Sequence, residues 1–367
     1  MMSVSGAKGK VGKLAGITKN TSSQLRLYFQ GHHNIGILPI DKGRDALCRV
    51  GFAFMASDLR SLSDKRLEKI ILNTCSLSPL LATMAHWADW SLHRQGFHGN
   101  LKKQPRFVFV KADYRFLELF YYYYLPRIKP ETRFILSTGD SDATLPLQVD
   151  KRFKAHSDEQ IKVLRDIHND PRVVHWYAQN IDTDWPKLTA IPLGYWELGG
   201  SSILRHAIEN PWSTLPRQKP LKVFCANRIR PGAQWEIRRT VAQRAINEWS
   251  DLVDYYDSVS PEDFFEVISR YPFVMCVGGG GLDPSPKAWT ALLAGCIPIV
   301  EWNATTEAYR DLPVIIIDSW KTLELDAALL HEWLSRCEPH FTDPLLRSKL
   351  LEKLSMGYWL NKVRGNH

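Results

Sequence analysis

Short apolar runs alternate with amphipathic segments along the first half of the chain. The apolar runs are rich in branched and aromatic residues, which is typical of buried strands, and the segments between them have apolar residues at helical spacing. The pattern predicts strands at residues 47–55, 106–110, 133–137, 173–178 and 188–193, and helices at residues 64–75, 80–90, 116–124 and 157–168. Alternation of this kind indicates an α/β domain with a parallel sheet.

The second half of the chain repeats the alternation after a break. Residues 210–220 are rich in proline and polar residues, which predicts a linker. Beyond it the pattern predicts strands at residues 221–226, 252–256, 273–277, 297–300 and 314–317, and helices at residues 235–247, after Pro261, and at 285–294, 323–336 and 345–360. We therefore expect a basic tail at 1–33, one domain at 34–210, a second at 221–345 and a C-terminal helix at 346–367.

Composition sets broad limits on the class of protein. A chain of 367 residues with 44% hydrophobic residues suits about two globular domains. The formal net charge is +8, partly from the N-terminal tail, and it favours anionic ligands. The six cysteines are scattered without a Cys-x-x-Cys pair, and no apolar run is long enough to span a membrane or to form a secretory signal. We expect a cytoplasmic protein.

The most informative stretch lies between residues 273 and 300. An apolar strand at 273–277 leads into four consecutive glycines at 278–281, whose backbone can approach a ligand closely. Ser285 is a good N-cap, and Lys287 adds a cation to the first helical turn. A strand, a glycine loop and a helix N-terminus in this order suit a phosphate or diphosphate. A tight connection between strand and helix is the alternative interpretation.

The same stretch resembles the donor-site motif of exostosin-type glycosyltransferases. In that motif a Ser-Pro-Arg start is followed by a Glu-Ala pair and a Gly-Cys-x-Pro strand, and the matching residues here are Ser285-Pro286-Lys287, Ala291-Leu292 and Gly295-Cys296-Ile297-Pro298-Ile299. Further similar segments at 109–113, 139–142, 178–180, 187–194 and 312–314 extend the resemblance over residues 108–320. The resemblance implies two Rossmann-like domains facing across a cleft (a GT-B-like fold), with transfer of a sugar from a nucleotide donor.

The resemblance places a UDP- or GDP-linked donor in the second domain, with the first domain on the acceptor side. The candidates for donor binding that lie in the motif are Gly279, Gly280, Gly281, Ser285, Lys287 and Thr290. Arg228 and Glu301 are added because each stands at a strand end of the second domain, although Arg228 can also be an ordinary surface arginine. Two positions depart from the family. Thr290 replaces the glutamate that binds the ribose hydroxyls in the family. Lys287 replaces an arginine, so an ammonium group stands where a bidentate guanidinium is usual. Glu301 either reaches the same pocket or faces solvent at its strand end.

Inverting sugar transfer, by a hexosyl- or pentosyltransferase, needs a general base near the acceptor hydroxyl. Asp113, Asp140 and Asp142 each follow a first-domain strand directly. Asp142 is the preferred candidate because two neighbouring acids can raise one pKa into a useful range. The alternative is that these aspartates cap turns. The Asp140-Ser141-Asp142 sequence lies in the wrong domain, relative to the glycine loop, for a metal that holds the diphosphate, so we expect no metal cofactor.

The sequence also suits two other classes of protein, an inactive binder of nucleotides or sugars and a nucleic-acid binder. Thr290 makes a catalytically inactive nucleotide- or sugar-binding protein of the same fold a genuine alternative. The positive charge also suggests a nucleic-acid binder, but lysine and arginine are dispersed and no nucleic-acid-binding motif is present. We therefore expect a nucleotide sugar and a glycan or glycoconjugate acceptor as partners, with no nucleic acid, while peripheral contact with a membrane is left open.

Overall fold

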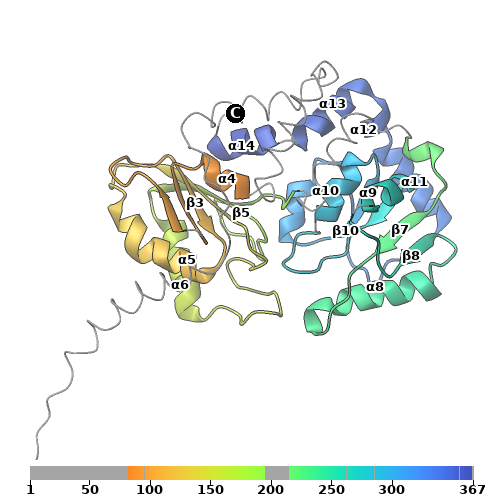
Figure 1. The fold of residues 1–367 in the computed structure, drawn as a ribbon, viewed down its shortest axis with the longest axis horizontal. Coiled ribbons are helices and arrows are strands. Elements are labelled where there is room, and N and C mark those ends of the chain that lie inside the picture. Colours follow the sequence, from red (N-terminus) through yellow and green to blue (C-terminus); the bar gives the residue numbers. More distant parts are fainter. Residues whose placement is uncertain are drawn as a thin grey trace, which may run out of the picture.

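The computed structural model describes residues 82–94, 96–194, 215–261, 263–284, 286–354 and 356–365. It contains two α/β units that lie side by side, each built on one sheet (Figure 1). The predicted tail, the strand at 47–55 and the helix at 64–75 lie outside the described residues, as do residues 210–214 of the predicted linker.

The first sheet has six strands in the order β2-β1-β3-β4-β5-β6. All neighbouring strands are parallel except β1 and β2, which form an antiparallel pair. The strands are β1 (Trp90–His93), β2 (Gly96–Gly99), β3 (Phe107–Lys111), β4 (Phe134–Gly139), β5 (Val173–Ala178) and β6 (Leu188–Ala190). The four predicted strands that fall on described residues of this unit are confirmed, with ends shifted by up to three residues.

Helices of the first unit follow the prediction except at its start. They are α4 (Ala82–Trp87), α5 (Tyr114–Leu119) and α6 (Asp158–Asn169), with a π-helical turn at Phe120–Tyr124 and a 3₁₀ turn at Leu125–Arg127. The predicted helix at 80–90 is wrong at its C-terminal end, because Trp90 begins β1. The Asp89 carboxylate accepts the N–H groups of Arg106 and Phe107, 2.8 and 3.0 Å away, and so ties the chain beside β3.

The second sheet is entirely parallel, with the order β11-β10-β9-β7-β8. Its strands are β7 (Val223–Ala226), β8 (Val253–Tyr256), β9 (Phe273–Met275), β10 (Ile297–Glu301) and β11 (Ile315–Ile317). The chain builds outward from β7 to β8 and then returns to the other side of β7 with β9. The strand order therefore reverses between β7 and β9, and ligands of such sheets bind beyond the carboxyl ends of the strands at this point.

The predicted helix at 345–360 is wrong as a single element. The helices of this half are α8 (Glu236–Asn247), α9 (Phe264–Ser269), α10 (Pro286–Leu293), α11 (Ala327–Cys337), α12 (Pro339–Thr342), α13 (Pro344–Lys353) and α14 (Met356–Arg364), with 3₁₀ turns at Pro216–Gln218, Ala233–Trp235 and Ala304–Tyr309. At the end of helix α13 the Leu354 carbonyl accepts the Trp289 indole N–H, and the Lys353 carbonyl accepts that of Trp359.

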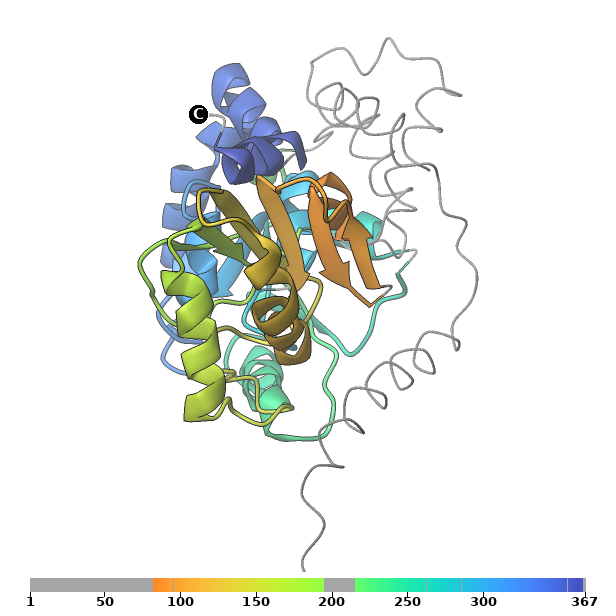
Figure 2. The same cartoon turned by 90° about the vertical axis from the view of Figure 1, so that its left-hand side faces the viewer.

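Helix α14 returns to the first unit. The Tyr177 hydroxyl donates to the Lys362 carbonyl at 3.1 Å, and the Arg364 guanidinium donates to the Trp87 carbonyl at 3.2 Å. Figure 2 shows the C-terminal helices above one end of the first sheet. The larger hydrophobic core accordingly includes Val363 together with the second sheet and one face of the first. The two parallel sheets confirm the predicted α/β class with two Rossmann-like domains.

Candidate functional site

The glycine loop that follows β9 is where the two units meet. Gly281 has φ +70°, which favours glycine, but Gly278, Gly279 and Gly280 lack a positive φ. A Cβ on Gly279 would lie 2.3 Å from Nη2 of Arg238, and one on Gly280 would lie 2.4 Å from Nη2 of Arg152. Only at Gly278, among these four, would an added Cβ meet nothing within 4 Å. The loop is thus rich in glycine because protein side chains close on it.

Three amides of the loop are bonded to side chains of the first unit. The Gly281 N–H donates to Oδ2 of Asp150 at 2.7 Å, and the N–H groups of Leu282 and Asp283 both donate to Oδ1 of Asn180 at 2.9 Å. The sequence suggested that loop amides would receive a diphosphate. At these three positions a carboxylate and an amide oxygen of the protein occupy that role, so this part of the loop joins the two units.

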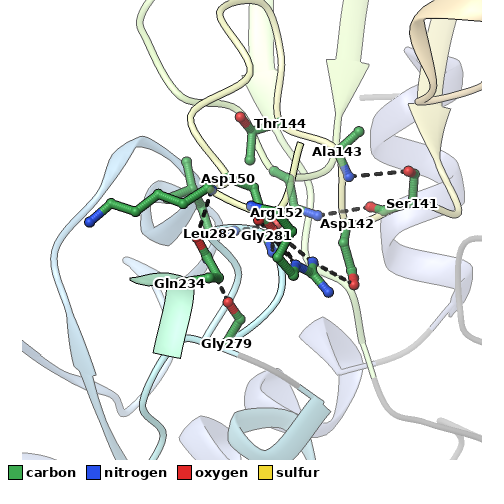
Figure 3. Close-up of polar contacts among 12 residues, drawn as sticks. Ser141, Asp142, Ala143, Thr144, Asp150, Arg152, Gln234, Gly279, Gly281 and Leu282 are labelled. Atoms are coloured by element: carbon green, nitrogen blue, oxygen red, sulfur yellow. Dashed lines mark hydrogen bonds and ion pairs between the residues drawn. The ribbon is translucent and has the colours of Figure 1, made fainter. Parts of the chain in front are cut away.

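Asp150 and Arg152 form the centre of the junction (Figure 3). The Asp150 side chain is fully buried, and both its oxygens accept hydrogen bonds from the Arg152 guanidinium. The same guanidinium donates to Oδ2 of Asp142 at 2.8 Å. The hydrogen bonds that Arg152 donates to these two carboxylates, chiefly to Asp150, raise the pKa of Arg152, although burial opposes the rise. The predicted base Asp142 therefore lies against Gly280 in an ion pair.

Two further polar residues complete the junction. Gln234 donates to the Gly279 carbonyl at 2.6 Å and accepts the Lys151 N–H at 2.8 Å, so it bridges the units. The buried carboxylate of Asp283 accepts the Leu193 N–H at 2.9 Å and the Tyr309 hydroxyl at 2.9 Å. Burial, and then the charge of Asp283, raises the pKa of Tyr309.

A group of cations surrounds the switch point between β7 and β9. The partly buried Lys287 donates to the Ala226 carbonyl and, at 2.9 Å, to Oδ1 of Asn227, both at the carboxyl end of β7. Burial lowers the pKa of Lys287 to about 8. Arg238 donates to the carbonyls of Val277 and Gly278, and burial together with neighbouring arginines lowers its pKa to about 10.

Arg228 and Arg230 add exposed cations beside this group. The Arg228 carbonyl accepts a hydrogen bond from Arg238 at 2.9 Å, which places the two residues next to each other. The structure therefore brings three predicted donor-site elements together at the carboxyl edge of the second sheet: the glycine loop, Lys287 and Arg228. Positive charge concentrated at this edge suits a polyanionic ligand.

The other two candidate bases are also paired with cations. The Asp113 carboxylate caps α5 and accepts two hydrogen bonds from the Arg115 side chain; burial opposes ionisation, but these bonds prevail and lower the pKa of Asp113. Asp140, at φ +57°, accepts a hydrogen bond from the buried Lys111 ammonium at 3.0 Å. Burial lowers the pKa of Lys111 even though Asp140 opposes it.

The side chains of Thr290 and Glu301, two further predicted donor residues, have hydrogen-bond partners outside the glycine loop. The buried Thr290 donates its hydroxyl to the Pro286 carbonyl one helical turn earlier, at 3.0 Å. Glu301 accepts the Trp320 N–H at 3.2 Å, at the far side of β10 from β9. Ser285 lies outside the described residues. Donor contacts by these three residues stay predictions.

Sequence reasoning missed the junction residues Asp150, Arg152, Gln234 and Asp283 as parts of the site. The sequence pointed to Asn180 only as part of the segment 178–180, which resembles the exostosin-type family. Its φ of +52° reflects the sharp turn that directs its side-chain amide to the loop. The available signal was the Asp-x-Arg spacing of Asp150 and Arg152, which permits one carboxylate to grip the following guanidinium. Nothing in the local pattern links either residue to a glycine loop 130 positions away.

The described residues contain neither a cluster of metal ligands nor a helix that could span a membrane. No group of three or more histidine, cysteine, aspartate or glutamate side chains within the described ranges could hold a metal ion. In the same part of the chain no helix is long and apolar enough to cross a bilayer.

Comparison with known proteins yields remote structural likenesses. No family model matches the chain, and no curated protein matches it. Among solved structures the chain is similar to an α1,3-fucosyltransferase at 10% identity and a TM-score of 0.31, covering 74% of this chain and 80% of that one. It is also similar to a GtfA/B complex at 11% identity and a TM-score of 0.34, covering 72% of this chain and 59% of the other. The exostosin resemblance thus stays a hypothesis.

Proposed function

We propose that this protein transfers a sugar from a nucleoside-diphosphate donor to a hydroxyl acceptor. One observation carries the proposal: the cations of Lys287 and Arg238 lie at the carboxyl ends of β7 and β9, where the strand order of the second sheet reverses, and the Arg228 backbone is bonded to Arg238. Sheets of this type bind ligands at that point. A diphosphate is a ligand whose negative charge suits these cations.

The cations would also serve the reaction. When the glycosidic bond to the donor breaks, negative charge grows on the departing diphosphate, and fixed positive groups stabilise that charge. Lys287 is suited to this task because its ammonium group is held beside the loop by Ala226 and Asn227. The open space at Gly278 leaves a place where a phosphate oxygen can approach the backbone.

Asp142 remains our candidate for the base that deprotonates the acceptor. It extends from the first unit to the edge of the glycine loop, and its side chain is half exposed. Arg152 occupies Oδ2 of Asp142, so the acceptor would have to displace Arg152 from Asp142 and leave it on Asp150. Asp140 and Asp113 are the rival candidates.

A nucleotide-binding protein without transferase activity is the second candidate. It is favoured by Thr290, whose hydroxyl is bonded within its own helix, and by the closed ion pair at Asp142. Both candidates share the nucleotide site, and they differ in whether a sugar is released.

Two measurements test these proposals in sequence. Calorimetry with UDP and GDP should detect binding to the wild-type chain, and Lys287→Ala should weaken it. A panel of UDP- and GDP-sugars should then reveal slow hydrolysis of one donor, since water can replace the acceptor. Absence of any nucleotide binding contradicts both candidates, whereas binding without sugar release across the panel, with and without glycan acceptors, favours the inactive binder.

A further inference from the structure

One loop of the first unit presents apolar and basic side chains to solvent in alternation. Leu147, Val149 and Phe153 are 38, 46 and 48% exposed, and Lys151 stands between the last two. The intervening residues Gln148 and Asp150 are buried. Their contacts explain the alternation: the Gln148 N–H donates to Asp182 at 2.8 Å, and Asp150 accepts the Gly281 N–H. These hydrogen bonds of Gln148 and Asp150 hold the loop so that the apolar side chains between them face solvent.

The second unit adds side chains of the same two kinds. Ile229 is 39% exposed, and it lies between the exposed Arg228 and Arg230. The two loops lie together because Lys151 is bonded to Gln234 and because the Arg152 guanidinium lies 5.8 Å from the Trp235 ring (Figure 3 labels Arg152 and Gln234).

The aromatic contacts continue across the junction. The Arg152 guanidinium also lies 5.3 Å from the Phe153 ring, and that of Arg230 lies 5.3 Å from Trp235. We call the exposed set the rim, and its members are Leu147, Val149, Lys151, Phe153, Lys154, Ile229 and Arg230. Eleven large hydrophobic side chains are exposed in the described part of the chain, and four of them belong to the rim. Exposed apolar side chains are therefore concentrated on these two loops.

All charged members of the rim are cations, namely Lys151, Lys154 and Arg230. Residues 147–156 contain three lysines and arginines and one carboxylate, Asp150, which is buried and bonded to Arg152. Residues 227–235 contain two arginines and no acid. A second copy of the same face would meet this charge with like charge. An anionic lipid surface would meet it with opposite charge, and the apolar side chains could enter the boundary between headgroups and acyl chains.

We propose that the rim docks this protein onto the surface of an anionic membrane. Exposed lysines interleaved with exposed Val149 and Phe153 combine the two forces that hold a protein at such a surface. Each lysine near an anionic bilayer strengthens binding about fivefold, and the apolar side chains add attachment that does not depend on lipid charge.

The test is co-sedimentation of the full chain with vesicles, without nucleotide. Phosphatidylcholine vesicles with and without phosphatidylserine are the probes. Two rim variants, Lys151→Glu with Lys154→Glu and Val149→Ser with Phe153→Ser, are compared with Leu345→Ser with Lys349→Glu on α13. The control pair is likewise exposed but lies outside the rim. The basic N-terminal tail is the same in every variant, so a difference between them reports the rim.

Wild type and the α13 control should bind phosphatidylserine vesicles equally, and more weakly as salt rises. The lysine pair should lose at least about thirtyfold in binding and the apolar pair at least about tenfold. Equal binding by all variants, or no binding by wild type, would overturn the proposal. A rim variant that instead changes the mass in light scattering would make the rim a self-association face. UDP affinity of the rim variants, measured separately, reports the nucleotide site and is independent of this outcome.

Discussion

The carboxyl edges of the two sheets differ in charge: carboxylates paired with cations lie at the first, and cations bonded to neutral oxygens lie at the second. At the first sheet the predicted catalytic carboxylates are each neutralised by a cation of the same unit, in the pairs Asp113–Arg115, Asp140–Lys111 and Asp142–Arg152. At the second sheet Lys287 and Arg238 donate to carbonyl and amide oxygens instead.

This difference in charge fits the two roles predicted from the sequence, which are donor binding at the second sheet and acceptor activation at the first. A diphosphate is attracted to an edge with surplus positive charge, which the second sheet supplies. In the reaction we propose, the hydroxyl acceptor needs a carboxylate that can be freed from its ion pair, and the first sheet carries three candidates for this role. The junction made by Asp150 and Asn180 keeps the two edges next to each other.

The largest expected effect would come from removing the proposed base. Asp142→Asn should lower turnover of the donor identified in the panel by about 10²- to 10⁴-fold, the usual share of general-base catalysis. UDP or GDP affinity should change little, because we propose that the donor binds at the other sheet. Asp113→Asn and Asp140→Asn, measured in parallel, should be milder. If Asp142→Asn keeps wild-type turnover while one of the others is inactive, the roles are exchanged.

The junction itself can be broken at Asp150. Asp150→Ala removes the acceptor of the Gly281 N–H and leaves Arg152 with only Asp142, so we expect about 3–5 kcal/mol of lost stability, as for a broken buried pair. Urea unfolding followed by tryptophan fluorescence measures the loss. Asp251→Ala, at an exposed turn, should cost less than about 0.5 kcal/mol. Similar stability of the two variants would mean that the junction is not a stabilising contact.

The cationic edge can be tested at Lys287. Lys287→Ala should weaken UDP or GDP binding by about 1–3 kcal/mol, or about 5- to 160-fold, because a charged hydrogen bond is lost. The pH dependence gives a sharper test. Burial lowers the pKa of Lys287 to about 8, below its ordinary value, so the ammonium form that attracts phosphate dominates below pH 8 and declines above it.

Wild-type affinity should therefore fall as the pH rises through 8, by up to about tenfold per pH unit. Calorimetry between about pH 7 and pH 9 would measure this slope. Lys287→Ala should abolish the slope, and the exposed Lys349→Ala should leave it intact. A wild-type slope that survives in Lys287→Ala would assign the titrating group elsewhere.

The smallest effect distinguishes the glycines of the loop. Gly281→Ala should destabilise the protein by about 1–2 kcal/mol, because φ +70° disfavours a side chain and Asn180 leaves no room for one. Gly278→Ala should be close to neutral in stability, since its Cβ would face open space. Thermal unfolding of the two variants measures the difference. If Gly278→Ala nevertheless weakens nucleotide binding, the phosphate approaches the backbone there, as proposed; equal instability of both variants would contradict the difference in space around the two glycines.

Local pattern was sufficient for most elements of both sheets. Strand β5 was predicted with its observed ends, and β10 and α10 to within one residue, because buried branched residues, Pro286 and the left-handed Gly295 act over a few neighbouring positions. The carboxylates at the strand ends and the glycine loop were located for the same reason. The notable misses were the β1–β2 pair and the division between α13 and α14, both of which depend on distant partners.

What the sequence by itself determined was therefore which residues stand at the carboxyl edges of two parallel sheets. Only the tertiary structure decided what those residues meet. The amides of Gly281 to Asp283 are bonded to Asp150 and Asn180, and Asp142 is paired with Arg152, through contacts that no local periodicity encodes. Hydrogen bonds and ion pairs depend on distances of about 3 Å in space, and folding sets those distances independently of separation along the chain.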